Sequence, residues 1–288
     1  MEAIQRYIAP RSLDEAAEIL RAGNVTVLAG GTDLMPQANA GRLPFQPVLM
    51  NVRRVPELCG IAKAGGVVRI GALVTISELL ESALVRERLG LLWQACDHFA
   101  SDQIRNAATL GGNVCNASPA GDTLVPLLAL EASAVLASKP NGRLEMRRVP
   151  LGQFFTGPGR TVRQPTELLA AVELPLPPKG FAGEFYKHGT RPGLDISAIS
   201  IAFGAVVERK LLTRVRIAFG AVAPTPIRAP RTEAVLEGRA PDAAILEAAA
   251  QAALAEIHPI SDVRASDWYR RELVRNMLKR VISHVGLL

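Results

Sequence analysis

Short apolar runs alternate with amphipathic segments along the first fifty residues of the chain. The runs Val25–Leu28 and Val48–Val52 are β-branched and apolar, as buried strands are, and Arg6–Ala9 has the pattern of a third, short strand. Ser12 and Glu15 have the spacing of a capping box, which opens a helix with the apolar face Leu13, Ala16, Ala17 and Leu20. This order of strand, helix and strand predicts a small parallel sheet with a right-handed crossover.

The middle of the chain combines both kinds of periodicity. Helical spacing runs from Ile76 to Leu92 and continues from Trp93 to Ala100, and Leu124–Leu130 is apolar enough for a buried helix. The runs that we expect to be strands are Val67–Ile70, Ala134–Ser138, Arg143–Val149 and Leu168–Leu174. A change of pattern near Pro56 and the prolines at 175, 177 and 178 indicate domain boundaries.

The last third has its own pattern. The charged turn Glu208–Lys210 lies within a predicted antiparallel sheet of the strands Phe185–His188, Ser197–Val207 and Val215–Ala221. Two helices, Ala243–Glu256 and Ser266–Val285, are expected to follow, and the second either packs on its own sheet or contacts another subunit. The patterns together predict an α+β protein in three parts, residues 1–55, 56–177 and 178–288.

Composition narrows the class of protein. With 288 residues, 49% of them hydrophobic, the chain can bury a sizeable core, yet its longest nearly apolar run, Ala198–Val207, is too short to cross a membrane. No signal peptide is recognisable, so we expect a cytoplasmic location. The net charge of +6 comes from dispersed basic residues, and only 5% of residues are aromatic, so we interpret it as a solvated surface rather than a nucleic-acid site.

Several kinds of chemistry lose support. The cysteines Cys59, Cys96 and Cys115 are odd in number and widely spaced, which disfavours a disulfide framework, a zinc site or an iron–sulfur cluster. The sequence has no H-E-x-x-H, no G-x-S-x-G and no glycine-rich run that ends in Gly-Lys-Ser/Thr. Metalloprotease, hydrolase and P-loop functions are therefore disfavoured.

Two glycine stretches remain. Gly30-Gly31 follows the predicted strand Val25–Leu28, where adjacent residues without Cβ let a ligand approach the main chain and offer N–H groups to an anion. Gly111-Gly112-Asn113 offers a second close approach, and Asp122 an acceptor for ribose or adenine unless it only caps the following helix. An ordinary turn would explain the first stretch alone. Both together indicate a dinucleotide or another phosphate ligand, and the absence of G-x-G-x-x-G disfavours a Rossmann site.

Longer motifs carry a resemblance. Ala29-Gly-Gly-Thr-Asp-Leu34, Gln103-Ile-Arg-Asn-Ala-Ala-Thr-Leu-Gly-Gly-Asn113 and Asn116-Ala-Ser-Pro-Ala-Gly-Asp122 resemble the flavin subunit of molybdenum hydroxylases, the family of xanthine dehydrogenase and the medium subunit of carbon monoxide dehydrogenase. The similarity extends from Tyr7–Ala16 through Glu167-Leu-Leu and Tyr186-Lys-His-Gly-Thr-Arg to the closing Tyr269-Arg-Arg.

The resemblance implies a fold and a site. The fold would be a two-part FAD-binding domain of the vanillyl-alcohol-oxidase/MurB type, followed by a small α+β domain. The residues that would bind FAD are Val27, Leu28, Ala29, Gly30, Gly31, Thr32, Asp33 and Leu34 around the pyrophosphate, Thr109, Gly111, Gly112 and Asn113 at phosphate and ribityl, Asp122 at the adenosine portion, and Phe99, Leu169 and Lys187 beside the isoalloxazine. Phe99 and Leu169 could instead be core residues, and Lys187 a solvated lysine.

The resemblance also implies partners. A large subunit with molybdopterin would oxidise the substrate, a small subunit with two [2Fe–2S] clusters would relay electrons, and the FAD of this chain would pass them to a terminal acceptor, in a dimer of heterotrimers. This chain would then hold no catalytic side chain and no metal. A positive Lys187 beside the flavin would raise its potential.

Three alternatives stay open on the sequence. A 4-hydroxybenzoyl-CoA reductase type of subunit would need four cysteines on an inserted loop, a self-contained flavin oxidoreductase would need its own acid–base pair, and a non-enzymatic binding protein would bind no FAD. The substrate of the complex and the terminal acceptor are not determined by this chain.

Overall fold

The computed structural model describes residues 4–191 and 193–286, which divide into two compact units. Unit 1 comprises the chain up to Glu78 together with residues 101–116 and 132–174. Unit 2 comprises residues 79–100 and 117–131 and the chain from Pro175 onwards. Each unit is therefore assembled from segments that are separated in sequence, and the predicted sequence boundaries near residues 56 and 178 stay a prediction.

The first sheet of unit 1 is the predicted parallel one. It contains β1 (Arg6–Ile8), β2 (Val25–Leu28) and β3 (Val48–Asn51) in the order β1-β3-β2, and both pairs are parallel. The helix α1 (Leu13–Arg21) links the first two strands, and the Ser12 hydroxyl accepts a hydrogen bond from the Glu15 N–H, as its capping-box position predicts. Because the strands are parallel, the glycine turn after β2 begins at the edge where all three strands end.

A second sheet of unit 1 packs against α1. Its strands are β4 (Ile61–Ala64), β5 (Val67–Gly71), β10 (Leu168–Pro175), β6 (Ser133–Ser138) and β7 (Glu145–Pro150), in that spatial order. Leu13, Ala16 and Leu20 of α1 share one buried cluster with Ala137 of β6 and with Leu168 and Ala170 of β10. The hairpin of β8 (Phe155–Gly157) and β9 (Arg160–Thr161), and the strand β4, are absent from the prediction because such short segments carry little periodicity.

The helices between residues 76 and 116 are shorter than predicted. The expected helix from Ile76 to Leu92 is wrong as one element, because it is divided into α3 (Ile76–Glu81), α4 (Ala83–Arg88) and the first turn of α5 (Gly90–Asp97). Ser82 adopts extended angles and its hydroxyl caps α4 by accepting from the Val85 N–H, while Leu89 lies outside helical space with φ −129° and ψ 45°. The short helices α2 (Leu34–Asn39), α6 (Asp102–Arg105) and α7 (Leu110–Asn116), and the 3-10 turns Pro56–Leu58 and Leu151–Gln153, were not predicted.

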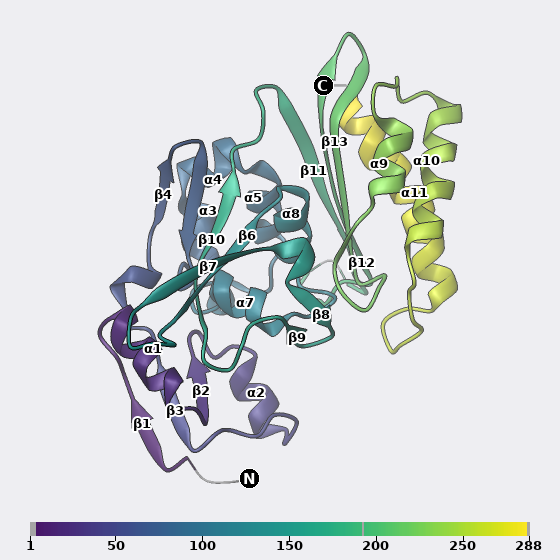
Figure 1. The fold of residues 1–288 in the computed structure, drawn as a ribbon. Helices are drawn as coiled ribbons and strands as arrows, with labels where there is room; N and C mark the ends of the chain where they lie inside the picture. Colours follow the sequence, from purple (N-terminus) through teal and green to yellow (C-terminus); the bar gives the residue numbers. More distant parts are fainter. Residues whose placement is uncertain (1–3, 192, 287–288) are drawn as a thin grey trace. The chain divides into compact units, whose positions relative to one another are not determined.

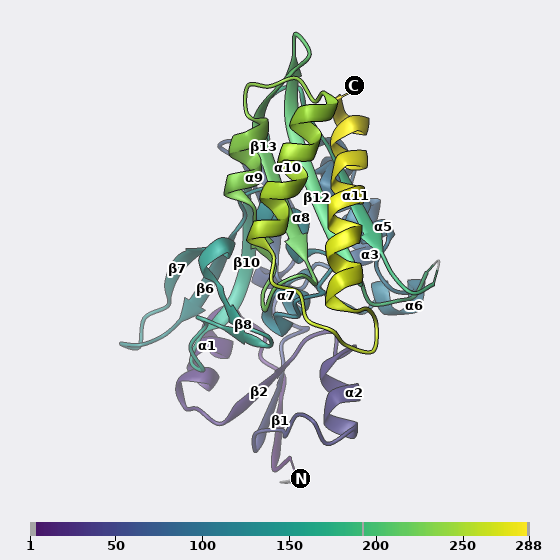
Figure 2. The same cartoon turned by 90° about the vertical axis from the view of Figure 1, so that its right-hand side faces the viewer.

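Unit 2 is built on a four-stranded antiparallel sheet with helices on both faces. The strands β11 (Phe181–His188), β12 (Ile199–Glu208), β13 (Leu211–Gly220) and β14 (Ile227–Arg228) follow in order, with the predicted charged turn joining β12 and β13. Figures 1 and 2 show α9 (Pro230–Leu236), α10 (Ala243–Glu256) and α11 (Asp267–Gly286) along one face. The helices α5 and α8 (Leu124–Ala129) also pack on these strands.

The interior of unit 2 explains the apolar stripe of the last helix. Val274, Leu278 and Val281 of α11 lie in one buried cluster with Ile201 and Phe203 of β12. The interpretation of this helix as packed on its own sheet is therefore confirmed, and α+β is confirmed as the fold class.

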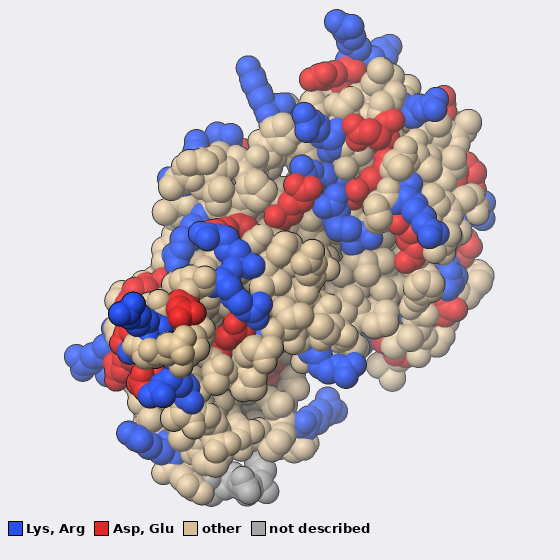
Figure 3. All heavy atoms as spheres, viewed as in Figure 1, with Lys and Arg blue, Asp and Glu red and all other residues tan. Residues whose placement is uncertain are grey.

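The surface agrees with a solvated charge distribution. On the face drawn in Figure 3, Lys and Arg side chains are interspersed with Asp and Glu. None of the described helices combines the length and the apolar composition that crossing a bilayer requires.

Arg270 joins three segments of unit 2 at the first turn of α11. Its side chain is 3% exposed and donates to the carbonyl oxygens of Ala198 and Ala221 and to the Asp262 carboxylate, at 2.7 Å for the last contact. Among the described residues, its Nε has no hydrogen-bond partner. The central arginine of the closing Tyr-Arg-Arg motif therefore supports the fold of unit 2.

We expect Arg270→Met to lower the free energy of unfolding of unit 2 by several kcal/mol. The substitution leaves carbonyl acceptors that face Arg270 without their donor, at about 1–3 kcal/mol each. Urea unfolding followed by tryptophan fluorescence measures the change, because Trp93 and Trp268 both lie in unit 2.

Arg271→Met is the matched control, because this neighbour is 37% exposed and pairs with Asp267 one turn away. An exposed pair of this kind contributes about 0–1 kcal/mol. Equal shifts of the urea midpoint in the two variants would contradict the role of Arg270.

Candidate functional site

The first glycine turn of unit 1 holds main-chain donors without protein acceptors. It connects β2 to α2, and Gly31 has φ +72°, which favours glycine. Within residues 4–191 and 193–286, the N–H groups of Gly30, Gly31 and Thr32 make no hydrogen bond to protein, although these residues are partly buried. Buried N–H groups are almost always paired, so this turn has free capacity for an acceptor such as a phosphate oxygen.

The second glycine segment lies directly against this turn. A Cβ atom at Gly30 would lie 2.0 Å from the carbonyl oxygen of Ala107 and 3.2 Å from Cα of Ala108. Thr109 follows at once and forms an isolated bridge with Thr75. Unit 1 therefore brings together the two stretches that the sequence analysis singled out, and glycine at position 30 is required by this packing.

The amides of the second segment, unlike those of the first, are largely used by the protein. The N–H groups of Leu110 and Gly111 donate to the carbonyl oxygens of Val74 and Ala72 at 2.9 Å, and that of Gly112 donates to the Thr109 hydroxyl at 3.0 Å. Because the Thr109 oxygen accepts this bond, its O–H is the group that it can still donate. We conclude that backbone donors for an anion come from the first turn, and that the second contributes the Thr109 hydroxyl.

Asp122 and Lys187 form a buried ion pair in unit 2. Their side chains are 10% and 6% exposed, and Lys187 Nζ lies 2.7 Å from Asp122 Oδ2 and 3.1 Å from the carbonyl oxygen of His98. The Ser197 hydroxyl donates to Asp122 Oδ1 at 2.7 Å. Burial raises the pKa of Asp122, while Lys187 and the Ser197 bond act against that rise.

This geometry decides one alternative from the sequence. The N-cap of α8 is Thr123, and no side chain caps that helix, so Asp122 does not serve as a helix cap. Lys187 is also not a solvated lysine, because its ammonium is buried against Asp122. Sequence reasoning missed Ser197 and the His98 carbonyl, which no local pattern identifies.

The remaining predicted residues lie elsewhere in the two units. Leu169 is 3% exposed on β10 opposite Leu136 of β6, a position equally suited to a core residue. Phe99 is partly buried just after α5 in unit 2. Val27 and Ala29 pack against the cluster around α1, and the Asp33 carboxylate accepts a hydrogen bond from Gln37. Their roles toward a ligand stay predictions.

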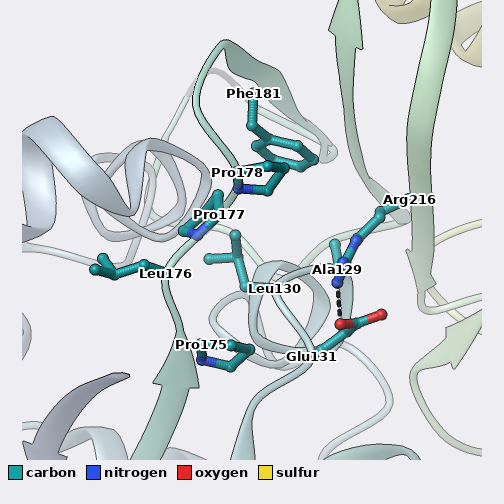
Figure 4. Close-up of a pocket in the computed structure, with 9 residues that line it drawn as sticks. All are labelled: Ala129, Leu130, Glu131, Pro175, Leu176, Pro177, Pro178, Phe181 and Arg216. Carbon is teal, nitrogen blue, oxygen red and sulfur yellow. Dashed lines mark ion pairs between the residues drawn. The ribbon is translucent and has the colours of Figure 1, made fainter. Parts of the chain in front are cut away.

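Two hollows lie away from these residues. The first, in unit 2, has a volume of about 40 Å³ and is lined by proline and leucine side chains beside the Arg216–Glu131 ion pair (Figure 4). It is far smaller than the several hundred Å³ of a ligand pocket. The second, an open hollow of about 580 Å³ in unit 1, is lined by Arg11, Arg53, Arg54, Val55, Pro56 and Cys59, none of which was predicted to bind the ligand.

Metal chemistry finds no support in the described part of the chain, where no three His, Cys, Asp or Glu side chains form a group that could hold a metal ion. Cys115 lies in α7 beside the second glycine segment, and burial raises the pKa of its thiol, which keeps it neutral. An additional cluster of the kind expected for a 4-hydroxybenzoyl-CoA reductase subunit therefore has no ligands in these residues.

Comparison with known proteins agrees with this site. Residues 2–177 match the family described as FAD binding domain in molybdopterin dehydrogenase, and residues 184–285 match the family described as CO dehydrogenase flavoprotein C-terminal domain. The chain is 35% identical over 259 residues to a putative xanthine dehydrogenase FAD-binding subunit of Escherichia coli, which covers 89% of this chain and 87% of that protein. It is 33% identical over 282 residues to the carbon monoxide dehydrogenase medium chain of Hydrogenophaga pseudoflava, with 96% and 95% covered.

A solved structure gives the same result for the fold. A chain of the Hydrogenophaga pseudoflava carbon monoxide dehydrogenase that lacks the Mo-pyranopterin moiety of the molybdenum cofactor superposes with a TM-score of 0.92 at 32% identity, over 98% of this chain and 97% of that chain. The predicted fold type, an FAD-binding domain followed by a smaller α+β domain, is thereby confirmed. The chain belongs to the FAD-binding subunits of the molybdenum hydroxylase family, which includes the xanthine dehydrogenases and the carbon monoxide dehydrogenases.

Proposed function

We propose that this chain binds one FAD and serves as the electron-transfer subunit of a molybdenum-containing dehydrogenase. The observation that carries the proposal is the turn from Ala29 to Asp33, with its unused N–H groups, in contact with the segment that leads to Thr109. A flavin dinucleotide carries two phosphates, and free N–H groups beside glycine residues form a site of that chemistry. Bound FAD would supply the electron-transfer chemistry, and the protein would supply binding, orientation and electrostatics.

The partners in this proposal are a large subunit with molybdopterin and a small subunit with two [2Fe–2S] clusters. Support comes from relatives that carry the name medium chain, and from the mention of a molybdenum cofactor in the matched carbon monoxide dehydrogenase structure. Assembly as a dimer of heterotrimers, delivery of electrons to a terminal acceptor and a cytoplasmic location are parts of the proposal that rest on the sequence analysis.

Each unit contributes separate residues to the proposed FAD site. In unit 1, the N–H groups of Gly30, Gly31 and Thr32 would bind the pyrophosphate, and the Thr109 hydroxyl would donate to phosphate or ribityl. In unit 2, Asp122 would accept hydrogen bonds from the adenosine portion, and Lys187 would hold the Asp122 carboxylate in its orientation. Phe99, Leu169 and Lys187 are the residues proposed for the isoalloxazine.

The decisive experiment is to express the full chain with its neighbouring subunits and to purify the complex. The proposal expects a bound flavin visible by absorption, released on denaturation as FAD at one molecule per copy of this chain. A complex that is colourless, and that stays so when FAD is added, would overturn it.

For Thr109, we expect the substitution Thr109→Val to weaken FAD binding by about ten- to a hundredfold. The loss of one hydrogen bond to a charged group corresponds to about 1.5–3 kcal/mol. Thr109→Ser should restore the affinity, because it keeps the hydroxyl. Titration of the flavin-free chain with FAD, followed by flavin fluorescence, measures the change.

Ser12→Ala is the matched control for loss of a helix cap in unit 1, because Ser12 caps α1 and has no proposed role toward FAD. It should lower stability by about 1 kcal/mol and leave FAD affinity unchanged. If Ser12→Ala weakened FAD binding as strongly as Thr109→Val, the assigned role of Thr109 would be wrong.

For the ion pair, we expect Lys187→Met to destabilise unit 2 by about 3–5 kcal/mol at neutral pH, because it leaves the Asp122 carboxylate buried without its cation. Burial already raises the pKa of Asp122 in the folded protein, and loss of Lys187 raises it further. A folded-state pKa above the unfolded value gives stability that is present at low pH and lost as the pH rises through the folded pKa. The difference from wild type should therefore be smallest near pH 4 and grow toward neutral pH.

Urea midpoints measured by tryptophan fluorescence at several pH values test this expectation. The double substitution Lys187→Met with Asp122→Asn removes the stranded charge and should recover much of the stability lost at neutral pH. A destabilisation by Lys187→Met that is the same at every pH would show that the lost stability does not come from the Asp122 charge.

A further inference from the structure

Asp195 is a second carboxylate beside Lys187, and it has no full partner. Its side chain is 8% exposed, and its Oδ1 lies 3.8 Å from Lys187 Nζ, beyond hydrogen-bond range. Among the residues that the structure describes, no group donates to its buried Oδ2. By contrast, both oxygens of Asp122 are bonded, one to Ser197 and one to Lys187.

The charges of this cluster do not balance. Two carboxylates, Asp122 and Asp195, share one ammonium, all three nearly buried within unit 2. A buried carboxylate oxygen without a donor is unfavourable for folding, so stability of this form does not explain the presence of Asp195. Buried polar groups that lack partners are concentrated at sites where a ligand or a movement supplies what is missing.

The surrounding main chain makes room for Asp195. A Cβ at Gly189 would lie 1.1 Å from Asp195 Oδ2, so the carboxylate occupies the space that any side chain at position 189 would need. Gly189 lies two residues after Lys187, at the end of β11. Glycine at this position therefore permits the approach of Asp195 to Lys187.

Lys187 can exchange one acceptor for the other by a small movement. Nζ lies at hydrogen-bond distance from Asp122 and about 1 Å too far from Asp195, and a lysine side chain is a mobile point charge. The two acceptors come from different segments, Asp122 from the chain before α8 and Asp195 from the connection between β11 and β12. The geometry thus offers two ion-pair arrangements to one ammonium.

We propose that Asp195 is the alternative ion-pair partner of Lys187, which takes over the ammonium when Asp122 accepts hydrogen bonds from the adenosine portion of FAD. The inference rests on the proposed function and names Asp195 as a positioning residue of that site. Without Asp195, release of Asp122 would leave Lys187 as an unpaired buried cation. With it, Asp122 becomes available to a ligand while the charge of Lys187 stays compensated.

The first test is Asp195→Asn in the full chain, which keeps the shape of the side chain and removes its charge. The inference expects opposite effects on two measurements. The thermal midpoint of the FAD-free protein stays unchanged or rises, because an unsatisfied buried carboxylate is removed, while FAD affinity falls at least tenfold. A residue with a merely structural role would lower the thermal midpoint, and an unchanged FAD affinity would overturn the inference.

Gly189→Ala provides an independent variant, because a methyl group at this position displaces the Asp195 carboxylate. It should weaken FAD binding to a similar degree, and the combination with Asp195→Asn should weaken it no further. Additive losses of affinity would show that Gly189 acts by another route and would contradict the inference.

Ser200→Ala is the matched control for an unsatisfied buried polar atom without charge. Ser200 lies opposite Lys187 in the β11–β12 register, and its hydroxyl also lacks a partner among the described residues. FAD affinity should not change in this variant, and an equal loss there would refute a role of the Asp195 charge. If the wild-type chain itself bound no FAD, the proposed function would fail; if it bound FAD and Asp195→Asn bound it equally well, only the present inference would fail.

Discussion

The absence of a side chain at Gly30 is the constraint on which the proposed FAD site of unit 1 depends. The main chain of this residue lies so close to Ala107 that no Cβ can be placed between them. This contact fixes the turn after β2 against the segment that begins α7, although about eighty residues separate them in the sequence. The turn is held from outside and does not need its own N–H groups for internal hydrogen bonds, which leaves them for an anion.

The second unit solves a different problem, the burial of charge. Asp122 is held by Ser197 and Lys187, which satisfy both of its oxygens and favour the ionised carboxylate against the effect of burial. Lys187, in turn, faces more negative charge than it can neutralise, because Asp195 lies close by. A buried ion pair contributes little to stability on balance, so its value in such a place is the fixed orientation of an acceptor.

The two glycine segments and the ion pair together explain why a subunit of a redox enzyme needs no acid–base residues of its own. Its family membership assigns it FAD, and the chemistry of electron transfer belongs to that cofactor. The protein has to provide donors for a diphosphate, an acceptor for hydroxyl groups and a stable scaffold. Arg270, which joins three segments of unit 2, belongs to that scaffold, and this explains part of the closing Tyr-Arg-Arg motif without a role in chemistry.

The sequence by itself determined the strands and helices with strong periodicity, the parallel first sheet, the α+β class and, through its glycine motifs, the family. These features depend on neighbouring residues, such as the capping box of Ser12 and Glu15 or the stripe of α11, so they can be recognised locally. Tertiary structure alone decided that Ser82 and Leu89 divide a helical pattern, that the amides of α7 are used by Ala72 and Val74, and that Asp122 pairs with Lys187. Such contacts join residues far apart in the chain, and they depend on strand register and on the space that a missing side chain leaves, neither of which has a signal in the local order of residues.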